Sequence, residues 1–401
     1  MSHEAKLFSR REFLKTSSLV ALAPNVPGFL QRTARAAEVQ RDERILVVIQ
    51  LSGGNDGLNT VVPFADDGYA KHRAALRLPE ERLHKIDEGL GLHPSMKDAA
   101  DLFEQQRLAI VQGVGYPNPN RSHDVSMAIW HTARFDREEH SGYGWIGRAL
   151  DELPPPRRNA PASVLVDRES TPAALRGRKC VSTSFTSVEE LLTRRDVRVT
   201  AGSDTAADNL AAFVSRTALD ASTTADLLRE IAGKDRTAAA YPSSELAARL
   251  RLVSQLVQAD FGTRVYYAMQ DGYDTHSTQL NQHARLLREL SQALRAFLDD
   301  LASAGLEDRV LVLCFSEFGR QVQENASAGT DHGTAGPVLV AGASVAGGLL
   351  GASPDLSALD DNAPRHEIDF RSVYATILGQ WLGLFAVDIL GGDFTPLPLL
   401  A

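Results

Sequence analysis

The feature that most constrains the fold is a set of short apolar runs, each followed by a polar loop. Residues 45–50, ILVVIQ, hold five apolar residues, four of them β-branched. Such a run suits a strand that is covered on both faces, as in a parallel sheet. Comparable runs occupy 107–115, 263–272, 309–315 and 336–342. We expect these five segments to be strands of one buried sheet.

Segments with helical character alternate with these strands. They cover 93–106, 122–135, the residues after His276 and 366–383, where Asp369 is a plausible cap. The third is the longest, and its apolar residues recur with a period of 3.6. This alternation predicts an α/β domain over residues 44–400. Between about 150 and 260 a proline-rich connector precedes Ala- and Leu-rich stretches, 206–219 and 243–259 among them, which predict a largely helical insertion.

The N-terminus has the layout of an export signal. Arg10 and Arg11 precede Phe-Leu-Lys, a modest apolar run follows, and small residues stand near 34–38. The paired arginines resemble a twin-arginine signal, which is an address read by a receptor. We therefore expect residues 1–36 to be a signal peptide and the protein to be periplasmic or secreted. A basic, frayed helix is the alternative.

Charge narrows the range of partners. Residues 1–36 hold six Lys/Arg and two Asp/Glu, so the rest of a chain of net charge −9 carries −13. Such an acidic surface argues against nucleic acid, which requires clustered Lys and Arg. A small anionic substrate in a local pocket stays compatible with it. No run of about 18 apolar residues occurs, so we expect no membrane span.

Polar clusters follow four of the predicted strands. In open α/β sheets, ligands bind beyond the carboxyl ends of the strands, so these clusters are expected to face one crevice. Carboxylates and imidazoles together suit Zn²⁺, Mn²⁺ or Mg²⁺, as one ion or as two about 4 Å apart. The pooled candidates are Asn55, Asp56, Ser122, His123, Asp271, Asp274, His276, Glu317, Arg320, Asp331 and His332.

Each cluster also has a purely structural interpretation. The segment GGNDG at 53–57 could be a tight turn. Ser122 could serve only as the N-cap of its helix. Asp274-x-His276 could be a turn with its own hydrogen bonds. His283 lies seven residues beyond His276 on one helical face, where we expect a solvated or capped side chain. Asp331-His332, within a run of glycines, is the pair that is hardest to explain as structural.

The motifs together resemble the DUF1501 family of exported bacterial proteins. They are the twin-arginine leader, LSGGNDGLNT, NRSHDVSMAIWHT, DTH before a long helix, SEFGR, GTDHG and DFRSVYATIL. The resemblance covers about residues 44–385. It implies a place near the alkaline phosphatase-like superfamily, with sulfatases and metal-dependent phosphomutases. The implied fold is a three-layer α/β/α sandwich with a mostly parallel central sheet.

The resemblance also implies roles for particular residues. Ser122 would be the nucleophile at a helix start. To this we add our own candidates: His123 beside it, and Arg121 or Arg320 to stabilise charge on the transferred group. The metal ligands that it implies are Asp56, Asp274, His276, Asp331 and His332. We add Glu317 to the candidate ligands because it follows a predicted strand. The superfamily often spaces its Asp…His pair by three residues, so Asp271 is an alternative to Asp274. His366 is the only candidate for a late third histidine. The Cys-x-Pro-x-Arg signature of formylglycine sulfatases is absent.

Two functional hypotheses follow. In the first, the chain is an exported metal-dependent hydrolase of small anionic phosphate or sulfate esters, with a serine nucleophile and one or two divalent ions. In the second, it is a non-catalytic secreted metal-binding or assembly protein that keeps the fold and works beside an exported partner. A dinucleotide cofactor is not expected, because G-x-G-x-x-G is missing.

Overall fold

The computed structural model describes residues 44–401 except 137, 139–141, 158–159, 168–169, 186–197, 201–225, 232 and 235–236. Residues 44–401 form one compact unit. The expected signal peptide and the expected helix at 206–219 lie outside the described residues. No helix within the described part of the chain combines the length and the apolar character that crossing a membrane requires.

A central sheet of ten strands organises the described residues. Its order is β14-β5-β13-β10-β1-β9-β6-β7-β8, and β15 also pairs with β5. Most neighbours are parallel; β13 is antiparallel to both of its neighbours, and β8 is antiparallel to β7. The strands are β1 Ile45–Ser52, β5 Leu108–Gly115, β6 Ser163–Val166, β7 Ser182–Phe185, β8 Arg198–Thr200, β9 Val265–Asp271, β10 Val310–Phe315, β13 Gly336–Ala341, β14 Gly348–Leu350 and β15 Ile368–Asp369.

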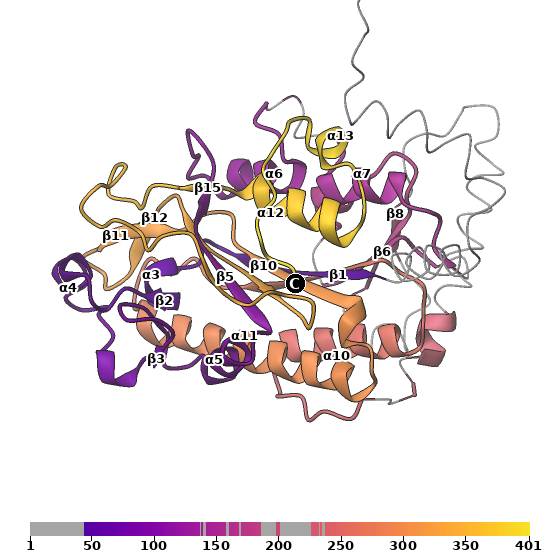
Figure 1. Ribbon diagram of the computed structural model, residues 1–401, viewed down its shortest axis with the longest axis horizontal. Coiled ribbons are helices and arrows are strands. Elements are labelled where there is room, and N and C mark those ends of the chain that lie inside the picture. The colour runs from indigo at the N-terminus through magenta and orange to yellow at the C-terminus, as the bar shows by residue number, and fades with distance from the viewer. Residues whose placement is uncertain are drawn as a thin grey trace, which may run out of the picture. The chain divides into compact units, whose positions relative to one another are not determined.

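Helices cover both faces of this sheet (Figure 1). One face carries α5 (Lys97–Glu104), α10 (Glu245–Gln258) and α11 (Gln279–Ser303), and the other carries α6 (His123–Thr132), α7 (Trp145–Glu152), α12 (Phe370–Thr376) and α13 (Ala386–Leu390). Successive residues of β1 enter opposite cores: Val47 packs with the first set and Val48 with the second. The apolar run at 45–50 is therefore buried on both faces, as its composition predicts.

Smaller elements complete the unit. Helices α3 (Gly57–Thr60) and α4 (Asp67–His72) follow β1, and a small sheet joins β2 (Val61–Val62), β4 (Gly91–Leu92) and β3 (His84–Lys85). A hairpin of β11 (Arg320–Glu324) and β12 (Thr330–His332) follows β10. Single turns of 3₁₀-helix lie at Glu80–Arg82, Ala173–Leu175 and Glu307–Arg309, and Ile377–Trp381 is a π-helix.

The predicted α/β class with a mostly parallel central sheet is confirmed. All five expected strands occur, and Asp369 caps α12 by accepting from the Arg371 N–H. Two features were not expected. Strands β6 to β8 extend the sheet from the region where helices were predicted, although α10 does lie there. The run around Asp331-His332 is a β-strand of a hairpin and not an open loop.

Candidate metal centre

The polar clusters meet because their strands end at one edge of the sheet. In the parallel ladders of β1, Ser52 pairs with Asp271 of β9 and Gln50 pairs with Phe315 of β10. The loops that begin at Gly53, Gly272 and Ser316 therefore leave the sheet side by side. Helix α6 begins at His123, after β5, and its first residue reaches the same place.

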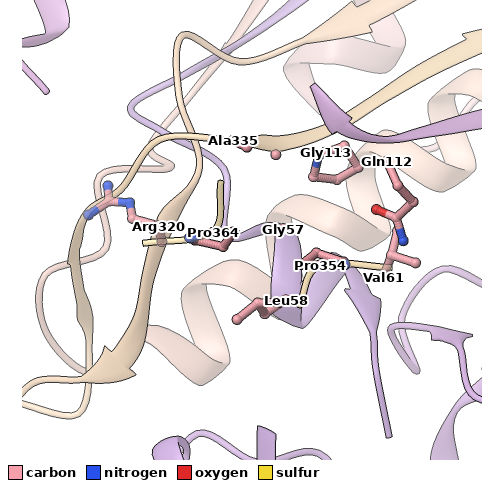
Figure 2. Close-up of a pocket in the computed structure, with 11 residues that line it drawn as sticks. Gly57, Leu58, Val61, Gln112, Gly113, Arg320, Ala335, Pro354 and Pro364 are labelled. Carbon is pink, nitrogen blue, oxygen red and sulfur yellow. The ribbon is translucent and has the colours of Figure 1, made fainter. Parts of the chain in front are cut away.

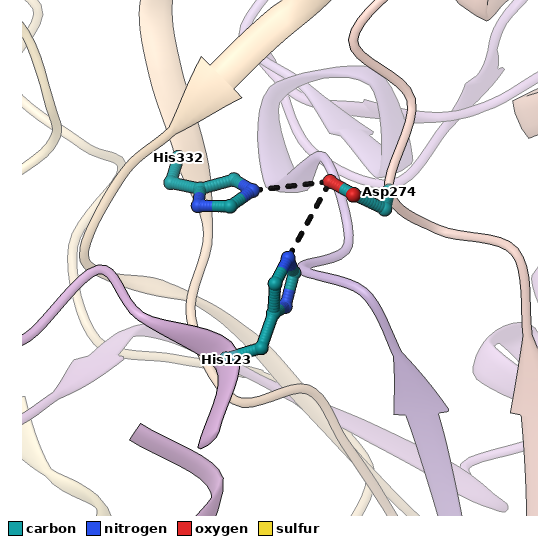
Figure 3. A group of neighbouring side chains, drawn as sticks. All are labelled: His123, Asp274 and His332. Atoms are coloured by element: carbon teal, nitrogen blue, oxygen red, sulfur yellow. Dashed lines mark hydrogen bonds and ion pairs between the residues drawn. The ribbon is translucent and has the colours of Figure 1, made fainter. Parts of the chain in front are cut away.

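The centre of the cluster is the carboxylate of Asp274 (Figure 3). Its Oδ1 lies 3.0 Å from Nε2 of His332 and 3.6 Å from Nε2 of His123. These three side chains form a group whose donor atoms could hold a metal ion. They come from the loop after β9, the end of β12 and the start of α6, which are far apart in the sequence.

A third imidazole joins this group. Nε2 of His276 lies 3.1 Å from Oδ1 of Asp274 and 2.9 Å from Nε2 of His332. The side chains of Asp274 and His276 are 48% and 44% exposed, so solvent and a substrate can reach the cluster. This places one carboxylate and three imidazole nitrogens around one accessible point.

All three imidazoles are oriented by a hydrogen bond at the other ring nitrogen. Nδ1 of His123 contacts Glu317 at 2.8 Å, and Nδ1 of His276 contacts Asp331 at 3.1 Å. Nδ1 of His332 contacts the backbone carbonyl of Arg121 at 2.8 Å. Carbonyls and carboxylates only accept hydrogen bonds, so each Nδ1 carries the proton. In a neutral ring, Nε2 then offers a lone pair to a metal ion, as in metal-binding histidines. Without an ion, a protonated ring instead donates from Nε2 to Asp274, which His332 approaches at 3.0 Å.

This protonation pattern has a consequence for His276 and His332. Their Nε2 atoms face each other at 2.9 Å, and when both rings are neutral the two lone pairs at that separation repel. A proton or a cation bound at this point removes the repulsion. The donor set fits a metal ion that accepts imidazole nitrogen, such as Zn²⁺ or Mn²⁺, better than Mg²⁺, which prefers oxygen ligands.

Asp274 is a charged ligand at neutral pH. Burial raises its pKa, but hydrogen bonds from Arg320 and His332 outweigh that effect and lower the pKa to about 2. Arg320 Nη2 donates to Oδ1 at 2.7 Å. The carboxylate therefore keeps its negative charge throughout the physiological range.

The pKa of His123 is shifted upwards. The hydrogen bond to Glu317 is the main cause that raises the pKa of its imidazole above the usual value, against a smaller opposing effect of burial. The imidazole of His123, hydrogen-bonded to Glu317, is thus a more basic metal ligand than a free histidine. More basic imidazoles bind metal ions more strongly once their proton has left.

Two glycines let the loops approach closely. Gly53 has φ +116°, and a Cβ there would lie 2.4 Å from the backbone N of Asp274. A Cβ at Gly329 would lie 2.2 Å from the carbonyl carbon of His276. Only glycine fits at either position, so the composition of these loops serves close packing around the cluster.

Asp56, expected among the ligands, lies in a different environment. It is fully buried, and its two oxygens accept from Arg73 at 2.6 and 3.0 Å. Burial raises the pKa of Asp56, but the charge and hydrogen bonds of Arg73 outweigh it and lower the pKa to about 2. The structure thus places Asp56 in a buried ion pair beneath the cluster and not among the donors around Asp274.

Glu317 and Asp331, also expected among the ligands, contact the Nδ1 atoms of histidines in the cluster. Glu317 is buried and accepts from the Gly53 N–H as well as from His123. Asp331 accepts from His276 and from the Asn325 side chain. Both carboxylates orient imidazoles in this geometry. The sequence left Asp271 and Asp274 as alternatives for the aspartate paired with the histidines, and Asp274 is the one that contacts His276 and His332.

Arg121 and Arg320, expected to stabilise charge on the transferred group, both bind other parts of the protein. Arg320 is 1% exposed and donates to the carbonyls of Gly53, Gly54, Tyr273 and Thr330. Arg121 forms an ion pair with Asp361 at 2.9 Å. Arg320 therefore binds the loops together beneath Asp274, and Arg121 contributes its carbonyl to His332.

Ser122 occupies the N-cap position of α6, and its hydroxyl makes no capping hydrogen bond. The residue is exposed and stands between Arg121 and His123, which both contact the cluster. The purely structural interpretation of Ser122 as a side-chain cap is therefore not what the structure shows.

A small pocket lies next to this region (Figure 2). It has room for about one water molecule. Its size excludes an organic ester, so the accessible cluster is the better candidate for chemistry. Its lining residues are Gly57, Leu58, Val61, Gln112, Gly113, Arg320, Ala335, Gly336, Pro337, Pro354 and Pro364.

A family model described as "Protein of unknown function (DUF1501)" matches residues 43–383. The chain belongs to the DUF1501 family. The match spans the central sheet and every residue of the cluster, which confirms the resemblance seen in the motifs. No sequence among curated proteins matches this DUF1501 chain.

Solved structures with a similar chain path include a sulfatase, PsFucS1 from Pseudoalteromonas sp., at 11% identity and a TM-score of 0.43, covering 93% of this chain and 75% of that one. Another is the lipoteichoic acid synthase LtaP from Listeria monocytogenes, at 10% identity and a TM-score of 0.34, with coverages of 87% and 76%. A third is alkaline phosphatase from the Antarctic bacterium TAB5, at 10% identity and a TM-score of 0.30, with coverages of 87% and 98%. None of these similarities assigns a residue role to the DUF1501 chain.

Three residues that support the site were missed from sequence. Arg73 neutralises Asp56, and Gln279 and Thr330 join the network beneath the histidines. Arg73 lies in an unremarkable segment, and a glutamine at a helix start carries no chemical signature. Only the adjacency of Thr330 to Asp331 could have drawn attention to it.

Proposed function

We propose that this DUF1501 chain is an exported metal-dependent hydrolase of phosphate or sulfate esters. One observation carries the proposal: three imidazoles, each anchored through Nδ1, direct Nε2 towards the carboxylate of Asp274. Within this cluster, Nε2 of His276 and Nε2 of His332 lie 2.9 Å apart, an arrangement that a bound cation stabilises when both rings are neutral.

His123, Asp274 and His332 would hold the ion, with His276 as a further donor. A divalent ion bound there would neutralise charge on the ester oxygens and favour ionisation of a nearby hydroxyl. Glu317, Asp331 and the Arg121 carbonyl keep the three rings in place, so the donors need little reorganisation on binding. Zn²⁺ and Mn²⁺ fit this set; one or two ions are compatible with the sequence motifs.

Ser122 is the proposed nucleophile. Its hydroxyl is exposed, is not used as a cap, and belongs to the segment between two residues that contact the cluster. In the proposed reaction, Ser122 Oγ bonds to phosphorus or sulfur while the bond to the alcohol oxygen of the ester breaks, and the serine proton passes to the departing alcohol. Water then breaks the new serine ester and releases the inorganic anion.

The substrate is proposed to be a small anionic ester, because a divalent ion and nearby imidazoles attract anions in an otherwise acidic chain. Arg121 could add to charge stabilisation by exchanging Asp361 for a substrate oxygen. Export through the twin-arginine pathway to the periplasm or beyond is part of the proposal and rests on the N-terminal motif.

Replacing Ser122 by alanine is expected to leave metal content unchanged and to lower ester hydrolysis by at least about 1,000-fold. The assay would use aryl phosphates and aryl sulfates with Zn²⁺, Mn²⁺ or Mg²⁺. Ser303→Ala is the matched control, since Ser303 is an exposed serine whose hydroxyl contacts only its own helix. Full turnover in the Ser122 variant would exclude this residue as the nucleophile.

The same assay separates the two functional hypotheses. Wild-type protein that binds metal but hydrolyses no phosphate or sulfate ester would favour the non-catalytic metal-binding or assembly protein.

A further inference from the structure

We propose that Gln279 is a positioning residue that fastens together the two segments carrying the proposed metal ligands. The inference rests on the proposed metal centre and goes beyond it, because Gln279 contacts no ligand side chain. It assigns a role to a buried amide that the sequence motifs did not single out.

The amide of Gln279 bridges two hydroxyls. Its Oε1 accepts from Thr275 Oγ1 at 3.0 Å and from Thr330 Oγ1 at 2.6 Å. All three side chains belong to buried residues, and Gln279 itself is 0% exposed. In such surroundings a lost hydrogen bond is not replaced by water, so each contact restrains its segment firmly.

Each threonine is a neighbour of proposed ligands. Thr275 lies between Asp274 and His276, and Thr330 precedes His332 by two residues. One oxygen atom of Gln279 thus holds the loop after β9 and the strand β12 at a fixed separation. The Nε2–Nε2 distance between His276 and His332, 2.9 Å, depends on that separation.

Asp56 fixes which way the amide faces. Nε2 of Gln279 donates to Asp56 Oδ2, whose carboxylate is held in turn by Arg73. A carboxylate can only accept, so the NH₂ group must face Asp56 and the oxygen must face the two hydroxyls. The buried ion pair therefore acts on the ligands through Gln279, which gives Asp56 a function without direct metal contact.

Backbone hydrogen bonds, together with Arg320, which donates to the carbonyls of Tyr273 and Thr330, set the same segments side by side. Thr330 N donates to Thr275 O at 3.2 Å, and Gln279 N donates to Ala328 O at 2.9 Å. Metal sites require their donors to be held within about 0.5 Å of the productive geometry. We assign the final alignment to the Gln279 amide.

The test uses full-length protein and three variants: Gln279→Leu, Thr275→Val and Thr330→Val. Valine keeps the shape of threonine and has a methyl group in place of the hydroxyl, so only the hydrogen bonds of the hydroxyl are lost. Thr376→Val is the matched control, because Thr376 is buried and its hydroxyl is hydrogen-bonded to Ser372 of α12 and to Leu397, with no contact to the site. Two quantities are measured: Co²⁺ affinity with its visible absorption spectrum, and hydrogen exchange of metal-free protein.

Each of the three variants is expected to weaken Co²⁺ binding by about 10-fold and to change the Co²⁺ spectrum, as loss of outer-shell support does at metal sites. In metal-free protein, Thr330→Val should speed exchange by about 10-fold in both 273–278 and 328–332. Thr376→Val should change neither quantity. If Gln279→Leu does not fold, the two valine variants decide.

Wild-type affinity and spectrum in both valine variants would overturn the inference. A wild-type protein that binds no Co²⁺ would contradict the proposed metal centre instead. In that case the exchange data still decide on Gln279: joint opening of both segments in Thr330→Val supports the coupling, and unchanged exchange overturns it.

Discussion

Replacing His332 by alanine is expected to weaken Zn²⁺ binding by roughly 100-fold and to remove ester hydrolysis. His332 is the imidazole that contacts Asp274, His276 and the carbonyl of Arg121 together. Four-donor zinc sites yield about 10–16 kcal/mol on binding, so one donor contributes about 3 kcal/mol. That share corresponds to about two decades in Kd.

The measurement is a competition titration with a zinc chelator at pH 7.5. His84→Ala serves as the matched control, because the ring of His84 contacts the carbonyl of Pro94 outside the cluster. Equal zinc affinity in the wild type and in the His332 variant would show that the ion, if any, binds elsewhere.

The second large effect is loss of stability in mild acid. Among the histidines that the structure describes, three outside the cluster are buried: His93, His131 and His283. Burial is the main cause that lowers their pKa values, to about 3, about 3 and about 4 respectively. The native state therefore keeps these rings neutral where the unfolded chain, with pKa values near 6.5, takes up protons.

Because of this difference in pKa, acid destabilises the native state. Stability from these residues is complete above about pH 6.5 and falls as the pH drops towards their native pKa values. Each buried histidine lowers the free energy of unfolding by about 1.4 kcal/mol per pH unit in that window. The three together therefore lower it by about 6 kcal/mol by pH 5. His123, whose pKa is raised, acts in the opposite direction and offsets part of the loss. Because the free energy of unfolding of a domain is only about 5–15 kcal/mol, we expect cooperative unfolding near pH 4–5.

Urea unfolding of chelator-treated protein at pH 7.5, 6.5 and 5.5 measures this slope. His131→Gln keeps a donor for Gln50 but cannot titrate, and should reduce the slope by about 1.4 kcal/mol per pH unit. An unaltered slope in both His131→Gln and His283→Gln would show that other groups cause the acid response.

The convergence of the clusters could be predicted because it follows from strand direction. Once the runs ending at Ser52, Asp271 and Phe315 are parallel neighbours, the loops after them must meet. The role of Asp56 could not be predicted in this way. Its partner Arg73 comes from a segment without a recognisable pattern, and a carboxylate in a buried ion pair looks like a ligand in sequence.

The histidines illustrate the same limit. His283 was expected to be solvated or capped, since it follows His276 by seven residues on α11. The structure buries it, with Nε2 against Asn55 at 2.9 Å. The contact of His276 with His332 depends on how the β11–β12 hairpin folds back over the loop after β9. Sequence spacing carries no information on that docking, and short polar strands such as β7 lack the apolar pattern that marked β1.

The most direct test of the central claim is the coordination of zinc in the purified wild-type protein, measured by metal analysis together with X-ray absorption at the zinc edge. We predict at least one zinc ion per chain, a first shell of two or three imidazole nitrogens with carboxylate oxygen, and weaker imidazole scattering in His332→Ala. Protein that stays metal-free in micromolar zinc, or zinc surrounded by oxygen alone, would contradict the account.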